Sequence, residues 1–222
     1  MTEAHSDQHP HTPGKLIRWA FLYDVLMGAL TLGHEARLRE ITLDLVGLQA
    51  GEKVLDVGCG TGSLAIAARR RVGPSGTVVG IDPAPEMVAR ARMKAARVGA
   101  DVRFETAVIE SLPFGSSEFD VVLSSLMIHH LPKRIRPAAF AEVHRVLKPN
   151  GRFLAVDFKP PTAGPGRFLF LTAHGLGHGM AHNDIRHNIP ALETAGFCVQ
   201  SEGPTRSWML SYILLGKAPA AA

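Results

Sequence analysis

Short apolar runs alternate with stretches of helical periodicity along most of this chain. Residues 35–48 place apolar side chains at 38, 41, 45 and 48, which is the spacing of one helix face. The runs at 53–58 and 119–125 are apolar on both faces, as buried central strands are. Strands and helices that alternate at this pace predict an α/β fold, in which helices cover both faces of a mostly parallel sheet. Further strand-like runs lie at 77–82, 102–107 and 152–158, and further helical stretches at 63–72, at 86–98 and in the Ala-rich segment that ends at 147.

The end of the chain breaks this alternation. Two strand-like runs, 197–203 and 207–217, are separated by a turn with no helix between them. They predict a closing hairpin over 196–217, which makes the last strand antiparallel. No stretch between 49 and 217 has the length of an interdomain linker, so we expect residues 15–222 to form a single domain.

Two different patterns precede residue 49. Residues 1–14 are polar and rich in His and Pro, which predicts a disordered tail and argues against a secretory signal. Residues 16–32 are apolar, but Arg18 and Asp24 interrupt them, so they fall short of the roughly 20 apolar residues that a membrane span needs. We expect a helical element over 15–48, and its apolar surface leaves peripheral contact with a membrane open.

Composition narrows the class of protein only a little. Among the 222 residues, 46% are hydrophobic and 20% charged, which supports a sizeable core and excludes a mostly disordered chain. The two cysteines, Cys59 and Cys198, are too few for a disulfide framework, so a reducing cytoplasmic location is the expectation. The net charge of +4 is small and its charges are interspersed, so no nucleic-acid partner is inferred.

Three alternating glycines follow the first predicted strand. Gly58, Gly60 and Gly62 stand where the strand passes into a helix, which suits a loop that lets a ligand approach the backbone closely. A plain tight turn is the simpler interpretation. A dinucleotide-binding loop is the other alternative, but its spacing is Gly-x-Gly-x-x-Gly, and the carboxylate of Asp56 would repel a pyrophosphate. Asp56 instead suits a ligand with cationic or donor groups.

A second carboxylate stands at the end of the next predicted strand. Asp82 lies 20 residues beyond Gly62, where a carboxylate can accept hydrogen bonds from both hydroxyls of a ribose. A strand-end Asp also commonly caps the next helix, and Pro83 and Pro85 favour a helix start here. Both interpretations can hold together, and the pairing with the glycine loop favours ribose binding.

With these motifs the sequence resembles the class I S-adenosylmethionine-dependent methyltransferases, and among them the ubiquinone/menaquinone-biosynthesis group. VLDVGCGTG at 54–62 and GIDPAPEM at 80–87 match the first and second motifs of that family. SLPFGSSEFDVVLSSLMIHHL at 111–131 and VLKPNGRFLAVDF at 146–158 are similar to the stretches around its fourth and fifth strands. In the last motif Asn150 replaces a glycine, and Asn tolerates the left-handed conformation better than most residues do.

The resemblance implies a Rossmann-like, doubly wound sheet of seven strands with an antiparallel last strand, and S-adenosylmethionine as cofactor. It implies a helical lid over 15–48, a cofactor-binding core over 49–158, a substrate-side insertion over 159–195 and the closing hairpin. It also implies methyl transfer to a small, apolar acceptor such as a quinone precursor. A phospholipid or another N- or O-methyl acceptor, and a protein that binds the cofactor without turnover, stay open as alternatives. The cofactor residues that it implies are Asp56, Gly58, Gly60, Gly62, Asp82, Pro83, Met87, Val108, Ile109 and Ser124.

One position departs from the family pattern. Relatives commonly carry an Asp before the Leu-Pro-Phe triplet, where it binds the adenine amino group, and here Val108 stands in its place. Val108 and Ile109 are therefore assigned to an apolar wall beside the adenine.

The acceptor side has two candidate residues. His129 follows the fourth predicted strand and is the candidate for catalysis and substrate contact, with ordering of the loop as the competing role. Tyr23 resembles a lid residue of quinone-type relatives and is a substrate candidate, with a plain helix packed on the sheet as the alternative.

His174, His178 and His182 recur every four residues, but the glycines between them weaken a helix and no metal site is assigned.

Overall fold

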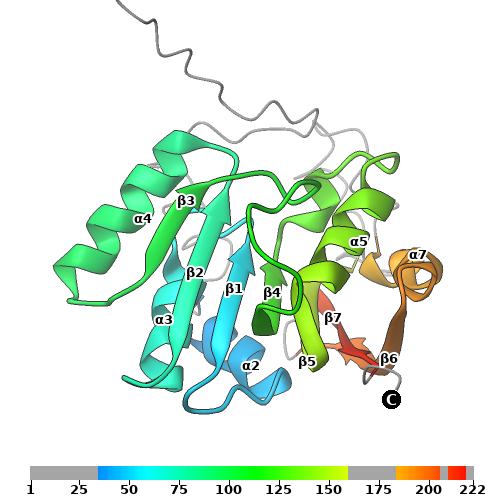
Figure 1. The fold of residues 1–222 in the computed structure, drawn as a ribbon, viewed down its shortest axis with the longest axis horizontal. Helices are drawn as coiled ribbons and strands as arrows, with labels where there is room; N and C mark the ends of the chain where they lie inside the picture. The colour runs from blue at the N-terminus through cyan, green and yellow to red at the C-terminus, as the bar shows by residue number, and fades with distance from the viewer. Residues whose placement is uncertain (1–34, 160–183, 206–209, 219–222) are drawn as a thin grey trace, which may run out of the picture.

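A computed structural model of the chain describes residues 35–159, 184–205 and 210–218. Within them a seven-stranded sheet forms, in the order β3-β2-β1-β4-β5-β7-β6, which confirms the predicted fold class (Figure 1). The strands are β1 (Lys53–Val57), β2 (Thr77–Asp82), β3 (Arg103–Thr106), β4 (Phe119–Ser125), β5 (Leu147–Phe158), β6 (Phe197–Pro204) and β7 (Leu210–Lys217). The helices are α2 (Glu35–Leu45), α3 (Ser63–Val72), α4 (Pro85–Arg97), α5 (Arg136–Val146) and α7 (Ile189–Thr194), with short 3₁₀ turns η1 (Ile128–His130) and η3 (Ile185–Asn188).

The first five strands are parallel and the last strand is antiparallel to both of its neighbours. β1 pairs in parallel with β2 and β4, so the carboxyl ends of these strands meet at one edge of the sheet, the upper edge in Figure 1. β7 pairs antiparallel with β5 and with β6. The loops that follow β1, β2 and β4 therefore lie next to one another, although 20 or more residues separate them in the sequence.

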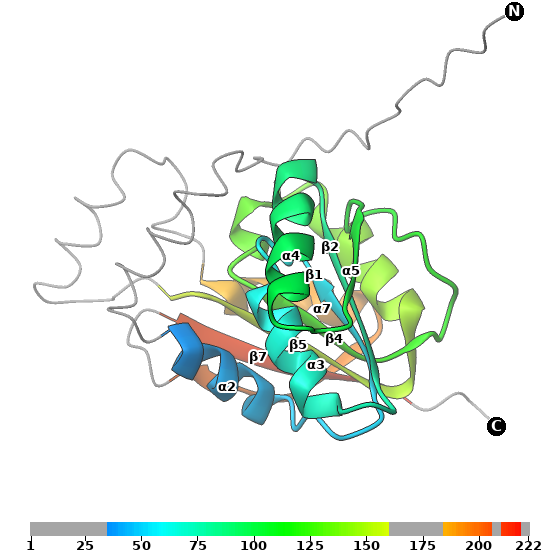
Figure 2. The ribbon, with the colours of Figure 1, turned by 90° about the vertical axis from the view of Figure 1, so that its left-hand side faces the viewer.

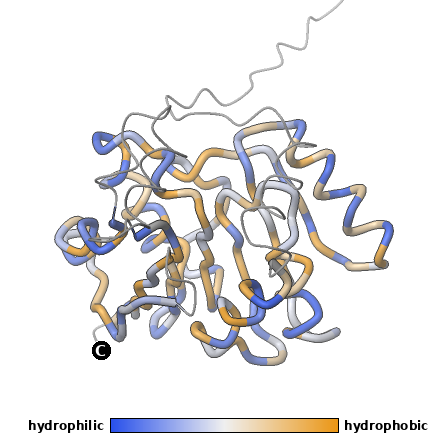
Figure 3. The backbone as a smooth tube through the Cα atoms, turned by 180° about the vertical axis from the view of Figure 1, so that it is seen from behind, coloured by the Kyte–Doolittle hydropathy of each residue, from blue (hydrophilic) through white to orange (hydrophobic). Residues whose placement is uncertain are grey.

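The sheet packs against its helices through two hydrophobic cores, one on each face. Alternate side chains of the strands face α5 and α7 on one side, where Phe119, Phe140 and Phe153 are fully buried. The other side chains face α2, α3 and α4, where Leu43 and Leu123 are fully buried. Figure 2 shows the sheet nearly edge-on between α3 and α5, and Figure 3 shows the hydrophobic strands inside more polar helices. Because both faces are covered, the central strands are apolar on both sides.

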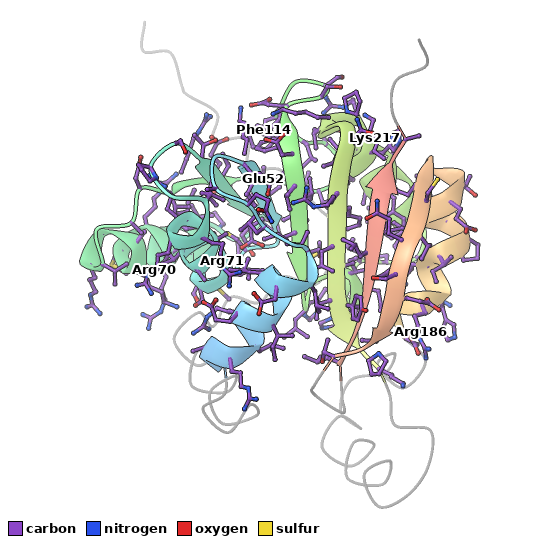
Figure 4. The ribbon with its side chains drawn as sticks, turned by 90° about the horizontal axis from the view of Figure 1, so that it is seen from below. Glu52, Arg70, Arg71, Phe114, Arg186 and Lys217 are labelled. Carbon is purple, nitrogen blue, oxygen red and sulfur yellow. The ribbon has the colours of Figure 1, made fainter. Side chains whose placement is uncertain are left out.

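The described part of the predicted lid, α2, packs against the outer face of α3. Arg71 of α3 pairs with Glu40 at 2.6 Å and with Asp44 at 2.8 Å, and Arg71 points toward α2 in Figure 4. The remainder of the predicted lid, the tail over 1–14 and most of the substrate-side insertion lie outside the described residues, so these remain predictions.

The turn before the fifth strand's apolar run has the expected left-handed residue. Asn150 has φ of +64°, a conformation that glycine and Asn adopt at lower cost than other residues. This confirms the left-handed conformation expected at Asn150.

Candidate functional site

The glycine loop joins β1 to α3 through three left-handed residues. Gly58, Gly60 and Gly62 have φ of +70°, +52° and +77°. The loop lies so close to its neighbours that a Cβ on Gly62 would stand 2.7 Å from the ring of Phe104, and one on Gly58 would stand 2.2 Å from Cγ of Met127. Glycine is therefore required here both for backbone conformation and for space.

Asp56 lies buried under this loop, with an exposed fraction of 1%. The backbone N–H of Ala65, in the first turn of α3, donates to its carboxylate, and Oδ2 has no hydrogen-bond partner. Burial, with a smaller contribution from the nearby charge of Asp82, raises the pKa of Asp56 to about 7. A buried carboxylate oxygen without a partner beside a glycine cradle fits a ligand that brings positive charge or N–H donors, as the methionine part of S-adenosylmethionine does.

Asp82 connects the glycine loop to the start of α4. Its Oδ2 accepts from the backbone N–H of Gly60 at 3.0 Å, and its Oδ1 accepts from the N–H of Ala84 at 2.9 Å. Burial raises the pKa of Asp82, and the two backbone donors oppose that rise. Both roles considered for Asp82 are compatible with this geometry, because each carboxylate oxygen has a further lone pair for a ribose hydroxyl.

The apolar residues predicted to line the adenine differ in their packing. Met87 and Val108 are buried, with 3% and 7% exposed, yet neither belongs to the two cores of the sheet. Ile109 is also buried, but it packs into the core on the α5 side. Pro83 is half-buried next to Asp82. Met87 and Val108 are thus better placed than Ile109 to form the wall of a ligand site.

A strained residue directs the chain after β4. Leu126 has φ of +55°, which costs a bulky residue about 1 to 2 kcal/mol. Its N–H donates to the carbonyl of Val156 at 2.8 Å, so the turn is held against β5. Met127 then lies against Gly58, and His129 follows in η1. This turn therefore brings the end of β4 to the glycine loop.

His129 forms a buried pair with Asp157, near the carboxyl end of β5. Nδ1 of His129 lies 2.7 Å from Oδ1 of Asp157, and the backbone N–H of His129 donates to Oδ2 at 3.0 Å. The two side chains are 5% and 2% exposed. The ring of His130 lies against that of His129 at a tilt of 43°, with 3.9 Å between their centroids. The imidazole of the candidate catalytic residue is therefore held by a carboxylate that the sequence interpretation did not single out.

A buried arginine, Arg136, interacts with the charge of Asp157 and forms hydrogen bonds to two neighbouring segments. Arg136 of α5 donates to the carbonyl of Leu131 at 3.1 Å and to Oδ1 of Asn188 at 2.9 Å. Burial lowers the pKa of Arg136, and the charge of Asp157 opposes this. Asn188 in turn donates to the carbonyl of Ile185 at 2.9 Å. Arg136 and Asn188 thus join the loop after η1, helix α5 and η3 to one another.

Two serine hydroxyls on the same face of the sheet have no hydrogen-bond partner. Ser124 of β4 and Ser211 of β7 are 1% and 0% exposed. Ser211 stands directly opposite Asp157 in the pairing of β5 with β7, so their side chains share a face. Ser124 pairs with Ala155, two residues before Asp157 on that face.

Several of these residues were missed by the sequence interpretation: Asp157, Arg136, Asn188, Ser211 and Met127. For Asp157 a signal existed, since it is the one acidic residue in the apolar run 153–158. Tyr23, His174, His178 and His182 lie outside the described residues. Over the ranges that the structure describes, no three His, Cys, Asp or Glu side chains gather as metal ligands would.

Comparisons with known proteins define the class of this domain. Residues 54–151, which contain the glycine loop, Asp82 and His129, match the family described as "Methyltransferase domain". Together with the sheet order and the curated relatives below, this match makes the domain similar to the class I S-adenosylmethionine-dependent methyltransferases.

Curated relatives include two quinone-related methyltransferases. The ubiquinone/menaquinone biosynthesis C-methyltransferase of a Geobacter species is 35% identical over 63% of this chain and 60% of its own length. The demethylmenaquinone methyltransferase of Thermus thermophilus is 38% identical over 64% of this chain and 63% of its own length. The aligned part thus spans about three fifths of each relative.

Solved structures share the fold at lower identity. A SAM-dependent methyltransferase from Aquifex aeolicus superposes with a TM-score of 0.66 at 24% identity, over 80% of this chain and 88% of the other. The cyclase SpnF superposes with a TM-score of 0.68 at 20% identity, over 83% and 81%. Since a cyclase shares this fold, the fold by itself does not specify the reaction.

Proposed function

We propose that this protein transfers a methyl group from S-adenosylmethionine to a small, apolar acceptor. The observation that carries the proposal is the buried, unpartnered carboxylate oxygen of Asp56 under a three-glycine loop, with Asp82 beside it. This arrangement supplies negative charge and close backbone approach, and both suit a sulfonium cofactor with an ammonium group and a ribose.

The chain's own residues bind and orient the cofactor in this proposal. When bound, S-adenosylmethionine supplies the electrophilic methyl group. Asp56 attracts the positively charged part, Asp82 accepts from the ribose hydroxyls, and Ser124 lies at the end of β4 next to the β1 loop. The glycines that give the ligand access are Gly58, Gly60 and Gly62. The residues proposed to lie beside the adenine are Pro83, Met87 and Val108, with Ile109 behind them in the core on the α5 side.

On the acceptor side, His129 is the proposed catalytic residue. It stands at the carboxyl edge of the sheet, and the turn that carries it contacts the glycine loop through Met127. An imidazole there can accept a proton from an acceptor group as the methyl group is transferred. Tyr23 remains a proposed substrate contact on sequence grounds alone.

The names of the relatives guide the choice of acceptor. Because the Geobacter and Thermus proteins are named as quinone-related methyltransferases, we propose a quinone precursor or a similar ring as the acceptor class. None of the helices that the structure describes has the length and apolar character to cross a bilayer. We propose a cytoplasmic enzyme with a small-molecule acceptor, with no nucleic-acid partner, and with peripheral membrane contact where the acceptor is lipid-like.

A turnover screen tests this proposal. The purified chain is incubated with S-adenosylmethionine and, in separate reactions, naphthalene-1,4-diol kept reduced, simple phenols, or phosphatidylethanolamine vesicles. The formation of S-adenosylhomocysteine is then measured. The proposal predicts turnover with the ring acceptors and little with the vesicles. Turnover with the vesicles alone would favour a phospholipid methyltransferase, and tight cofactor binding without turnover would favour a non-catalytic binding protein.

A further inference from the structure

One ammonium group links helix α4 to both sides of Gly62 in the glycine loop. Nζ of Lys94 donates to Oγ1 of Thr61 and to Oγ of Ser63, each at 2.8 Å. Thr61 is 3% exposed and stands between Gly60 and Gly62. Ser63 is the first residue of α3. Because Lys94 belongs to α4, this contact joins the loop and the start of α3 to a second helix.

The same part of α4 also packs against Gly62 itself. A Cβ on Gly62 would stand 2.8 Å from Cβ of Ala91, which precedes Lys94 by one turn of α4. It would also stand 2.7 Å from the ring of Phe104 in β3, and Nε of Arg92 donates to the carbonyl of Phe104 at 3.1 Å. In Figure 1, α4 lies beside β3. Helix α4 and strand β3 therefore form one packed support for the glycine loop.

The charge of Lys94 has the wrong sign to cap α3. The N-terminus of a helix carries partial positive charge, so acidic side chains stabilise it and a cation there is unfavourable. The N-cap of α3 is the left-handed Gly62, which makes no side-chain cap, and the first turn of α3 contains no acidic residue. Stabilisation of α3 therefore does not explain the position of Lys94, and its effect is to hold Thr61 and Ser63 in place.

The conformation of Thr61 matters for binding because the loop around it is rich in glycine. Glycine adopts many conformations in a free chain, so a loop with three glycines is ordered only where its contacts fix it. The N–H of Gly60 donates to the carboxylate of Asp82 at 3.0 Å and fixes the middle of the loop. Lys94 fixes the next residue through the Thr61 hydroxyl. Because a ligand binds only the molecules whose loop has the right conformation, the affinity falls in proportion to their fraction.

We propose that Lys94 is a positioning residue for cofactor binding, whose ammonium holds the glycine loop in its ligand-binding conformation through the hydroxyls of Thr61 and Ser63. This inference rests on the proposed function, because it takes S-adenosylmethionine as the ligand of the loop. Lys94 acts through the loop, so its loss lowers the affinity for the cofactor whatever the acceptor is.

Calorimetric titration with S-adenosylhomocysteine measures this effect without an acceptor. Lys94→Met keeps an unbranched apolar side chain and removes the donor. It should weaken the affinity roughly tenfold, because hydrogen bonds to charged groups are among the stronger ones and their loss frees the loop. An affinity within about twofold of the wild type in a folded Lys94→Met would overturn the proposal.

The matched control variant is Arg97→Met. Arg97 is an exposed cation one turn further along α4. The substitution removes the same charge from the same helix, and the affinity for S-adenosylhomocysteine should stay within about twofold of the wild type. An equal loss of affinity in Arg97→Met and Lys94→Met would show a general effect of removing positive charge from α4, which contradicts a specific role of Lys94.

Thr61→Val tests the same contact from its other end. It removes the hydroxyl and keeps the shape of the side chain, and it should weaken the affinity roughly tenfold. Adding Lys94→Met to it should cost less than about a further threefold, because the two residues act through one contact. Losses that multiply to about a hundredfold would show independent effects and refute the proposal. A Thr61→Val affinity within about twofold of the wild type would also refute it, even if Lys94→Met does not fold.

Backbone nitrogen-15 relaxation separates positioning of the loop from a general contribution to stability. In the ligand-free wild type, the amides of Gly60, Thr61 and Gly62 should have the order parameters of rigid backbone, about 0.85. In Lys94→Met they should show lower order parameters or exchange on the microsecond-to-millisecond timescale, and saturating S-adenosylhomocysteine should restore the wild-type values. Loop amides that relax alike in the two ligand-free proteins, or a change spread evenly over the strands, would contradict the positioning role.

The outcomes distinguish this inference from the proposed function. Failure of the wild-type protein to bind S-adenosylhomocysteine contradicts the proposed function. Binding by the wild type with equal affinity in Lys94→Met contradicts the role of Lys94 alone, and the proposed methyl transfer then stands.

Discussion

Substitution of Asp56 by Asn should make the stability of the ligand-free protein less dependent on pH. The carboxyl of Asp56 is 1% exposed, and burial raises its pKa from 3.8 to about 7. Asn keeps an oxygen that can accept from the N–H of Ala65, but it cannot ionise. The substitution therefore removes the titration and keeps the shape of the side chain.

The size of this pH effect on stability follows from the difference between the pKa of Asp56 in the folded chain and its pKa in the unfolded chain. A rise from 3.8 to about 7 corresponds to about 4 kcal/mol between the two protonation states. Below pH 3.8 the carboxyl is protonated in both the folded and the unfolded chain, so its contribution to stability is fully present. As pH rises toward 7 the unfolded chain loses the proton first, and stability decreases until the folded carboxyl also ionises. About 2.5 kcal/mol of this loss is expected between pH 5 and pH 8.

Urea denaturation of both proteins at pH 5, 6, 7 and 8 measures the effect. Because the buried amide adds a cost that does not vary with pH, the relevant quantity is the difference between the two free energies of unfolding at each pH. That difference should move in favour of Asp56→Asn by about 2.5 kcal/mol from pH 5 to pH 8. Parallel stability curves for the two proteins would refute a buried carboxyl with a raised pKa. Asp56→Asn should also bind S-adenosylmethionine more weakly, since the negative charge is lost.

Substitutions at three further positions test the fold, each by the free energy of unfolding in urea. Gly62→Ala should cost about 2 to 4 kcal/mol, because φ is +77° and the added Cβ meets Phe104 and Ala91; a cost below about 1 kcal/mol would contradict the close approach. Asn150→Gly should be neutral or slightly stabilising, while Asn150→Ala should cost about 1 kcal/mol; the reverse order would contradict the left-handed turn. Phe140→Ala should cost about 3 to 5 kcal/mol from the fully buried core, and a surface-like cost would contradict that packing.

The sheet could be predicted from the sequence because its signals are local. The buried strand β4 carries apolar residues on both of its faces, and the glycines after β1 mark the passage into α3. The antiparallel last strand was also predictable, because no helix separates the last two strands. Boundaries differ by a few residues: the helix expected over 35–48 ends at Leu45, where a turn around Gly47 begins.

The partners within the site could not be predicted because they depend on the register between strands. His129 and Asp157 are 28 residues apart, and they meet only because β4 and β5 are adjacent and a strained Leu126 turns the chain. The same applies to Met127 over Gly58 and to Ser211 opposite Asp157. The candidates His129, Asp56 and Asp82 were recognisable from motifs, whereas the contacts that give them their chemistry are tertiary.

Calorimetric titration with S-adenosylhomocysteine tests the central claim most directly, because it needs no knowledge of the acceptor. The glycine loop and Asp82 should bind this ligand, and Asp82→Ala should weaken the affinity roughly tenfold or more, as expected for lost hydrogen bonds to a charged group. Asp120→Asn, at the opposite end of the sheet, should bind as the wild type does. Unchanged affinity in a folded Asp82→Ala, or tighter binding of NADH than of S-adenosylhomocysteine, would contradict the assignment of this site.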